Sequence, residues 1–532
     1  MELPPASSRR HDLDALRAFA MLLGISLHAA LSFTGGPWMV QDSQTSRVFQ
    51  ILTSAVHGFR MPLFFVLSGF FTAMLWRRRG LRAVIEHRLR RVFLPLLLGT
   101  LTIVPVMFWL GAVAAGSGES RAEKGPPTLW KACAVGDHDL VRRLLDDGTD
   151  VNAPDPVLGV TPLSYAAMFG RDEVVKLLVQ RGADAKRTNR DGGTALHGAA
   201  FLGRASIVRE LLKVGADAKM KNERGETALD ATLADWGVTQ FIARIMKVPV
   251  EREVLMQGRS EVREMLGGDA KEARPRPVLA IWLFLTQMPI FSHLWFLWFL
   301  CWMVAGFSMC AWIANRIGWK PAPRRWVTSP LSGLWLVPLT LIPAWCMGRA
   351  MPNFGPDTSS SILPPLHLLA YYALFFGYGA LYFDSQDHEG RLGRRWWLIW
   401  PLALLVVYPA GLSLTYGSAK LRGMAILLQV IYVWMMSAAM MGLFRRFVSQ
   451  ERPWIRYLSD ASYWMYLAHL PLVIAAQLWV RDWPLAAAWK FLLVCGAVFA
   501  LLLVSYEYLV RYTWIGALLN GRKHRHTLAT QT

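Results

Sequence analysis

The chain has 532 residues, 54% of them hydrophobic, and it carries a formal net charge of +20. A composition this apolar, with long apolar runs from end to end, is typical of a helical membrane protein with several spans and excludes a soluble enzyme. Such a charge would suggest a nucleic-acid partner in a soluble protein, but here Lys and Arg gather in short loops between the apolar runs. We therefore expect the lipid bilayer, and no nucleic acid, to be the partner of these charges.

Ten apolar runs are long enough to form transmembrane helices. Lys and Arg are concentrated in alternate loops, which predicts that both termini lie in the cytoplasm. The first run is expected to remain as an anchor, because acidic residues precede it and further spans follow. The expected spans lie at about residues 14–34, 57–76, 92–114, 279–300 (extending to 314), 330–347, 365–383, 396–415, 423–444, 461–480 and 485–509.

The first span contains two unusual residues, Arg17 and His28. Their spacing corresponds to about three helical turns, so both side chains share one helix face about 16 Å apart along the axis. Asp14 falls near the same stripe. Alone, Arg17 is typical of an interfacial residue, and His28 is either a hydrogen-bonded contact between helices or a working imidazole. Together the three residues predict a polar stripe that faces the protein interior.

Residues 117–277 differ in composition, because Lys and Arg (25) nearly balance Asp and Glu (24) and a 33-residue repeat appears. The copies, each led by Thr, resemble ankyrin repeats. They begin at Thr128 (a degenerate copy), Thr161, Thr194 and Thr227. We expect residues 117–248 to fold as one α-solenoid and the charged residues 249–277 to be a tether.

The loop charges place this insert on the periplasmic side of the membrane, where we expect it to bind a protein or a glycan. It carries no catalytic constellation. His138 and His197 are expected to be surface or turn residues. No Cys/His cluster in the sequence has ligand spacing, so no metal site is predicted.

Spans two and three carry further polar residues. In HGFRMPLFFVLSGFF, His57 and Arg60 lie near the expected outer surface, and Ser68 lies deep in the bilayer at a close-packing point. The segment EHRLRRVFLP places Arg88 and Arg91 on one helix face at the cytoplasmic boundary. Such a pair is either a topology signal or a clamp for phosphate oxygens, because each guanidinium can donate two parallel hydrogen bonds.

These features occur in a characteristic order: Arg17 and His28, then FFVLSGF, then Arg88-x-x-Arg91, and later HLWFLWFL and SYWMYLAHLP. In this order they resemble the membrane acyltransferase-3 family, and the first two spans are most similar to a member that acts in glucan biosynthesis. The resemblance implies an all-α, polytopic helix bundle in the bacterial inner membrane. Its expected parts are residues 9–116 and 278–515, followed by a cytoplasmic tail, residues 516–532.

The resemblance also implies a chemistry, the transfer of a small acyl group, succinyl or acetyl, from cytosolic acyl-CoA to a hydroxyl of a periplasmic carbohydrate such as a glucan. It implies no permanently bound cofactor. The expected catalytic residues are His28, Arg17 and Asp14. The expected donor-binding residues are Arg88, Arg91 and Ser68, and the expected acceptor-binding residues are His57, Arg60 and His293.

Several alternatives remain open at this level. His28 is expected to act as a general base on the acceptor hydroxyl, but a covalent acyl-histidine relay is compatible with the same residues. His469 is as compatible with a structural role as with a functional one. A secondary transporter with a polar path, or a membrane-tethered ankyrin scaffold, are the rival classes.

Overall fold

The computed structural model is helical throughout its described parts, which contain no β-strand. It divides into two compact units, Met1–Gly118 with Leu285–Thr532, and Glu119–Phe284. Each unit is described by itself below. The described residues are 10–36, 38–122, 128–155, 159–223, 225–246, 248, 250–268, 281–282, 284–286, 288–318, 324–349, 352–417 and 419–521.

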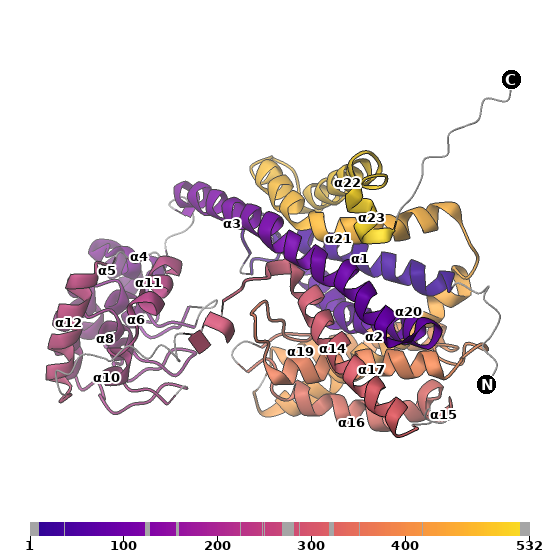
Figure 1. Cartoon of the computed structure of the whole chain (residues 1–532). Coiled ribbons are helices and arrows are strands. Elements are labelled where there is room, and N and C mark those ends of the chain that lie inside the picture. The colour runs from indigo at the N-terminus through magenta and orange to yellow at the C-terminus, as the bar shows by residue number, and fades with distance from the viewer. Residues whose placement is uncertain are drawn as a thin grey trace. The chain divides into compact units, whose positions relative to one another are not determined.

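The first unit is a bundle of long apolar helices (Figure 1). Three π-helical turns, Leu89–Phe93, Ala403–Val407 and Tyr506–Val510, interrupt or end its helices. The helices of this unit are α1 (His11–Leu31), α2 (Arg47–Arg88), α3 (Leu94–Ala122), α14 (Trp295–Arg316), α15 (Arg324–Thr328), α16 (Gly333–Ala344), α17 (Leu366–Asp384), α18 (Trp396–Leu402), α19 (Tyr408–Thr415), α20 (Arg422–Phe447), α21 (Pro453–Val480), α22 (Ala487–Ser505) and α23 (Trp514–Asn520).

Eight helices among the described residues are long and apolar enough to cross a membrane, which confirms a multi-pass membrane protein. The expected spans 57–76 and 92–114 both lie within one 68-residue stretch, Arg47–Ala114. Gly80 breaks this stretch with a left-handed φ of 80°. The expected span 330–347 corresponds to a shorter apolar helix, Pro330–Ala344. Of the expected tail, residues 522–532 lie outside the described residues.

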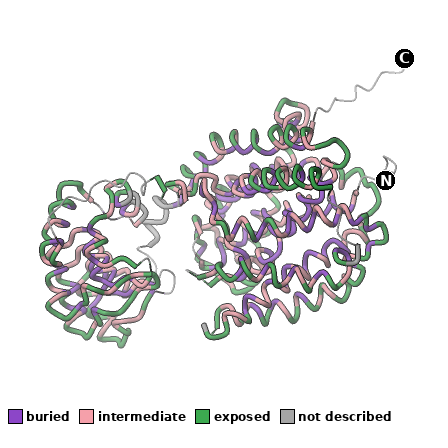
Figure 2. Tube along the Cα trace, turned by 60° about the horizontal axis from the view of Figure 1, so that its bottom comes forward, coloured by how far each residue is buried: buried purple, intermediate pink, exposed green. Residues whose placement is uncertain are grey.

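Glycines let α2 and α17 approach each other closely. A Cβ added at Gly69 would overlap the carbonyl oxygen of Phe376, and one added at Gly379 would overlap that of Val66. Small residues at a helix contact are what allow such backbone proximity in a membrane protein. The α1 helix packs against both α2 and α21. These contacts bring three segments that are distant in the sequence together, and Figure 2 shows buried residues along the helices of this unit.

The second unit is a stack of four helix pairs, as the repeat predicts. Each repeat Thr is the N-cap of a first helix, which satisfies an otherwise free backbone N–H. His197 is buried and completes the capping box of Thr194. The expectation that this residue is exposed at the surface was therefore wrong. The pairs are α4 (Leu129–Val135) and α5 (His138–Asp146), α6 (Pro162–Met168) and α7 (Asp172–Gln180), α8 (Ala195–Phe201) and α9 (Ala205–Lys213), and α10 (Ala228–Ala231) and α11 (Trp236–Ile245).

The tether expected at residues 249–277 is replaced over half its length by a helix, α12 (Arg252–Met265), that packs on the ankyrin stack. Its Arg259 is fully buried and donates hydrogen bonds to the carbonyls of Phe201 and Ala234 (2.6 Å) and to the hydroxyl of Thr239 (2.9 Å). A buried guanidinium with such partners fixes a helix in place, which composition alone does not reveal. Residues 269–277 lie outside the described residues.

Candidate active site

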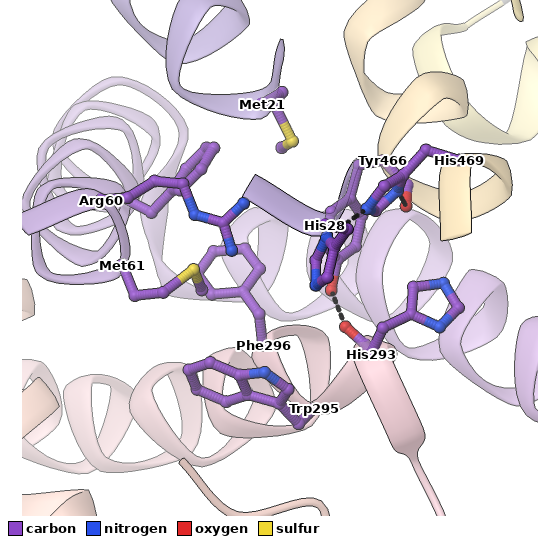
Figure 3. Close-up of a pocket in the computed structure, with 10 residues that line it drawn as sticks. Met21, His28, Arg60, Met61, His293, Trp295, Phe296, Tyr466 and His469 are labelled. Carbon is purple, nitrogen blue, oxygen red and sulfur yellow. Dashed lines mark hydrogen bonds between the residues drawn. The ribbon is translucent and has the colours of Figure 1, made fainter. Parts of the chain in front are cut away.

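Three helices and a turn of the membrane unit surround a small cavity of about 50 Å³. His28 comes from α1, Arg60 from α2, and His469 from α21. His293 comes from the 3₁₀ turn Ser292–Leu294 that leads into α14. Figure 3 shows these side chains around one space, with Met21, Met61, Phe64, Trp295, Phe296 and Tyr466 completing the wall.

Hydrogen bonds determine which nitrogen of His28 carries the proton. Its Nδ1 lies 2.8 Å from the carbonyl oxygen of Gly24 and 3.1 Å from Nε2 of His469. The Nδ1 of His469 in turn lies 2.7 Å from the carbonyl oxygen of Tyr466. Because a carbonyl only accepts, Nδ1 of each neutral ring must be the donor. His28 therefore carries its proton on Nδ1, with the carbonyl oxygen of Gly24 as the nearer acceptor and Nε2 of His469 as the farther one, and its Nε2 keeps a lone pair with no partner in the described chain.

Two other polar groups at the cavity have no partner within the described residues. His293 donates from Nε2 to the carbonyl oxygen of Leu467 (3.0 Å), and its buried Nδ1 is left as an unpaired acceptor. Nε of Arg60 is buried and also unpaired. No carboxylate of the described chain forms an ion pair with Arg60. Unpaired buried polar groups are costly and mark a place where a ligand can supply the partner.

Gly24 connects the imidazole and the guanidinium. Its carbonyl oxygen accepts from His28, and a Cβ at this position would overlap Nη1 of Arg60 and lie 3.8 Å from Nε2 of His469. Only a residue without a side chain leaves the guanidinium where it is. The packing of Arg60 beside His28 thus depends on one glycine in α1.

Trp38 and Gln477 hold His28 in position. Trp38 stacks on the imidazole with ring centroids 5.8 Å apart, and its indole N–H donates to Gln477 Oε1 (2.9 Å). The amide of Gln477 donates to the carbonyl oxygens of His28 (2.9 Å) and Ala29 (3.2 Å). The last turns of α1 are therefore held to α21 by side-chain hydrogen bonds, which limits the positions that the imidazole can take.

Three other predicted arginines are neighbours: Arg17 on α1, Arg88 at the end of α2 and Arg91 in the π-helical turn that follows it. Nη2 of Arg88 donates to the hydroxyl of Thr72 (2.7 Å), whose proton goes to the carbonyl oxygen of Ser68 (2.7 Å). Arg88 lies within electrostatic range of Arg17 and Arg91, and its Nε is buried without a partner in the described chain. Three neighbouring guanidinium groups with spare donors are suited to an anion such as phosphate.

Asp14 and His57 take positions that the sequence did not indicate. Asp14 lies 3.4 Å from Nη2 of Arg17 and, by helix spacing, about 21 Å along α1 from His28, so it supports the arginine and not the imidazole. Nε2 of His57 lies 3.0 Å from the carbonyl oxygen of Pro356, and His57 is not among the residues that line the cavity with Arg60. The structure thus gathers His28, Arg60 and His293, and separately Arg17, Arg88 and Arg91.

His469 is the main residue of the cavity whose role the sequence left undecided. Its only sequence signal is its place in SYWMYLAHLP, inside an apolar helix. Its partner His28 is 441 residues away along the chain, so only the packing of α1 on α21 reveals the pair. Within the described residues, no cluster of His, Cys, Asp or Glu could hold a metal ion.

Comparison with known proteins identifies the membrane unit. The model of an acyltransferase domain matches residues 10–121 and 237–507, which is more than half of the chain. The chain belongs to the acyltransferase-3 family. A model of three ankyrin repeats matches residues 129–222, which confirms the nature of the insert.

Curated relatives agree with this family assignment. Glucans biosynthesis protein C of Escherichia coli strains SMS-3-5 and K12, and of strain O1:K1, is 36% identical to the chain over 104 residues. The matched region is 20% of this chain and 26% of the relatives. The similarity therefore spans about a quarter of the length of these relatives.

Proposed function

We propose that this acyltransferase-3 protein transfers a small acyl group, succinyl or acetyl, from cytosolic acyl-CoA to a hydroxyl of a periplasmic carbohydrate such as a glucan. The observation that carries this proposal is the free Nε2 lone pair of His28 beside the unpaired guanidinium of Arg60. The name of the E. coli relatives supports a glucan as the acceptor. The ankyrin insert would bind a protein or a glycan near the acceptor.

The chemistry follows from these positions. Nε2 of His28 removes the proton of the acceptor hydroxyl as its oxygen attacks the thioester carbonyl carbon. The carbonyl oxygen becomes an oxyanion, which the guanidinium of Arg60 stabilises by charge and hydrogen bonding. The carbon–sulfur bond then breaks, and the imidazolium returns the proton to the departing thiolate of CoA. In the alternative relay, Nε2 attacks the thioester carbonyl carbon, and the carbon–sulfur bond breaks to release the CoA thiolate; the acceptor hydroxyl then attacks the acyl-imidazole, the carbon–nitrogen bond breaks, and the hydroxyl proton goes to the thiolate.

Two regions that contain arginine would bind different parts of the acyl-CoA donor, one its phosphates and the other its thioester. Arg88, Arg91 and Arg17 would bind the phosphates of CoA, and the hydrogen bonds from Arg88 to Thr72 and from Thr72 to the carbonyl oxygen of Ser68 would hold Arg88 in position. Thr72, the partner of Arg88, lies about 18 Å along α2 from Arg60. A thioester on an extended arm can bridge such a distance, so phosphates at the arginines would place the acyl group near His28.

The charges of the loops support the direction in which the donor and the acceptor would reach His28. The Arg-rich loops predict that the Arg88 end is cytoplasmic and that the loop before α2, like the insert, is periplasmic. A donor would then enter from the cytosol and an acceptor from the opposite side, with His28 between them. No transport of the acceptor is required by this arrangement.

Purified full-length protein with succinyl-CoA or acetyl-CoA and a periplasmic glucan tests the proposal. We expect release of free CoA thiol that depends on the glucan, together with ester-linked acyl groups on the recovered glucan. Solute flux without CoA release would support the transporter alternative, and neither activity would support the scaffold. Either of these two results would contradict the proposed function.

A further inference from the structure

A second cavity of the membrane unit, of about 250 Å³, is separate from the histidine cavity and much larger. The two share no lining residue, but neighbouring residues of α2 divide them, since Gly58 lines the larger cavity and Arg60 the smaller one. Nε2 of the neighbouring His57 lies 3.4 Å from the side-chain amide of Asn353, which lines the larger cavity. Gly58 and Arg60 are two residues apart, about half a helical turn, so a ligand in the larger cavity would lie across α2 from the histidine cavity.

Some polar groups of this second cavity only shape its wall. Gln429 accepts from the backbone N–H of Gly355 (3.1 Å) and donates to the hydroxyl of Thr415 (2.9 Å). Arg422 donates through Nη2 to the carbonyl oxygens of Trp345 (2.9 Å) and Met347 (2.7 Å). These bonds hold two loops in place around an open space, so the cavity is supported by hydrogen bonds on several sides.

Other polar groups at the cavity are left for a ligand. Tyr371 is 4% exposed, and its hydroxyl has no hydrogen-bond partner in the described parts of the chain, whereas the hydroxyl of Tyr372 donates to Asp357 (3.1 Å). The exposed guanidinium of Arg349 has neither a hydrogen bond nor an ion pair among the described residues. A hydroxyl of a cavity-lining residue that has no partner in the described chain can form a hydrogen bond with a ligand.

The charge of the lining identifies the class of ligand. Arg349 and Arg422 line the cavity, and no Asp or Glu does. A tyrosine hydroxyl, a carboxamide and guanidinium groups suit the many hydroxyls of a sugar, and the two cations suit a negative substituent. Resting on the proposed function, we propose that this cavity is the acceptor site and that it binds a carbohydrate bearing an anionic group.

Two variants and two matched controls test the acceptor site in the full-length protein. Tyr371→Phe removes only the unpaired hydroxyl, and Arg349→Gln removes only the free charge. The controls are Tyr508→Phe and Arg47→Gln, which change exposed residues outside the cavity. The saccharides are a linear glucose pentasaccharide and the same saccharide with one phosphate ester on its terminal glucose.

For Tyr371→Phe, we expect the acceptor KM of both saccharides to rise about five- to tenfold, the effect of one hydrogen bond, with the KM of the acyl-CoA unchanged. For Arg349→Gln, we expect a similar rise for the phosphorylated saccharide only. The controls should match the unmodified protein. Acceptor KM values that stay unchanged in both cavity variants would overturn the acceptor site while leaving the proposed function intact.

Saccharide binding in the absence of acyl-CoA, measured by intrinsic tryptophan fluorescence, distinguishes failure of the proposed function from failure of the proposed acceptor site. If the unmodified protein transfers no acyl group but binds the phosphorylated saccharide, and Tyr371→Phe weakens that binding, the proposed function fails and the carbohydrate site stands. Equal binding of the saccharide by the unmodified protein and both cavity variants would overturn the site.

Discussion

Nε2 of His469 lies 3.1 Å from Nδ1 of His28, and Nδ1 of His469 is committed to a backbone carbonyl. The second imidazole and the carbonyl oxygen of Gly24 both favour the tautomer of His28 that carries its proton on Nδ1, because both can only accept from it. The first reactive group of the proposed mechanism, the free Nε2 of His28, depends on a residue from the far end of the chain.

Replacing His469 tests its role as a positioning residue. His469→Ala removes one of the two acceptors for Nδ1–H of His28 and leaves the carbonyl oxygen of Gly24, and we expect kcat to fall by about tenfold to a hundredfold, as for other residues that orient a reacting imidazole. His469→Gln offers an amide oxygen as a substitute acceptor and should recover part of the rate. Steady-state kinetics at several pH values would measure both variants. Equal losses in the two variants would favour a role in packing alone.

Gly24→Ala should displace Arg60, because the added methyl group would overlap Nη1 of the guanidinium. We expect kcat/KM for acyl transfer to fall by roughly a hundredfold, the scale of a small misplacement of a reacting group. Gly306→Ala in α14 is the matched control, since a Cβ there would meet no atom within 4 Å. Normal activity of Gly24→Ala in kinetic assays would contradict the role given to Arg60.

The thiol of Cys133 should be unreactive in the folded ankyrin unit. Burial raises its pKa to about 12, so the thiol keeps its proton in neutral and mildly alkaline solution. Maleimide labelling followed by mass spectrometry should modify the exposed Cys310 and Cys346 in detergent before Cys133. Early labelling of Cys133 would show that this part of the stack opens readily.

The same pKa has a consequence for stability. The unfolded thiol ionises near pH 8.5, whereas the folded thiol does so near pH 12. The raised pKa therefore contributes stability below about pH 8.5, and this contribution is lost as pH rises toward 12. Hydrogen exchange of the ankyrin residues in the full chain should show weaker protection at the alkaline end of this range. In Cys133→Ala, this part of the pH dependence should be absent.

Arg259→Ala should destabilise the ankyrin stack, because it leaves the carbonyls of Phe201 and Ala234 without their buried donor. We expect a loss of about 3 kcal/mol or more in the free energy of unfolding of this unit. Arg252→Ala, at an exposed position of the same helix, should change it by less than about 0.5 kcal/mol. Protection of residues 129–265 from proteolysis in the full chain would measure both, and equal protection would contradict the buried role.

Local patterns predicted much of the fold. The spans follow from apolar length, and the repeats follow from Thr at each helix start, because both signals depend on nearby residues. The helix at Arg252–Met265 was missed because its charges suggested a solvated tether, although Arg259 finds acceptors up to 58 residues away. Burial of a charged residue is a property of the packed molecule and not of its local sequence.

The candidate site also has some features that local sequence predicts and others that only the packed structure reveals. Arg17 and His28 could be singled out because a polar residue inside an apolar helix is unusual. The pairing of His28 with His469 and the contact of His57 with the carbonyl oxygen of Pro356 depend on how distant segments pack, whereas the ion pair of Asp14 with Arg17, three residues apart on α1, follows from helix spacing. The catalytic and binding roles given to these residues remain predictions.

The rate of acyl transfer by His28→Ala tests the central claim most directly. The measurement compares glucan-dependent CoA release by the variant and the unmodified protein at equal amounts of folded protein, with the unfolding temperature as a check. A general base or an acyl-accepting imidazole at this position predicts a fall of at least about a hundredfold. A variant that keeps its fold and retains transfer within about tenfold of the unmodified rate would contradict both versions of the mechanism.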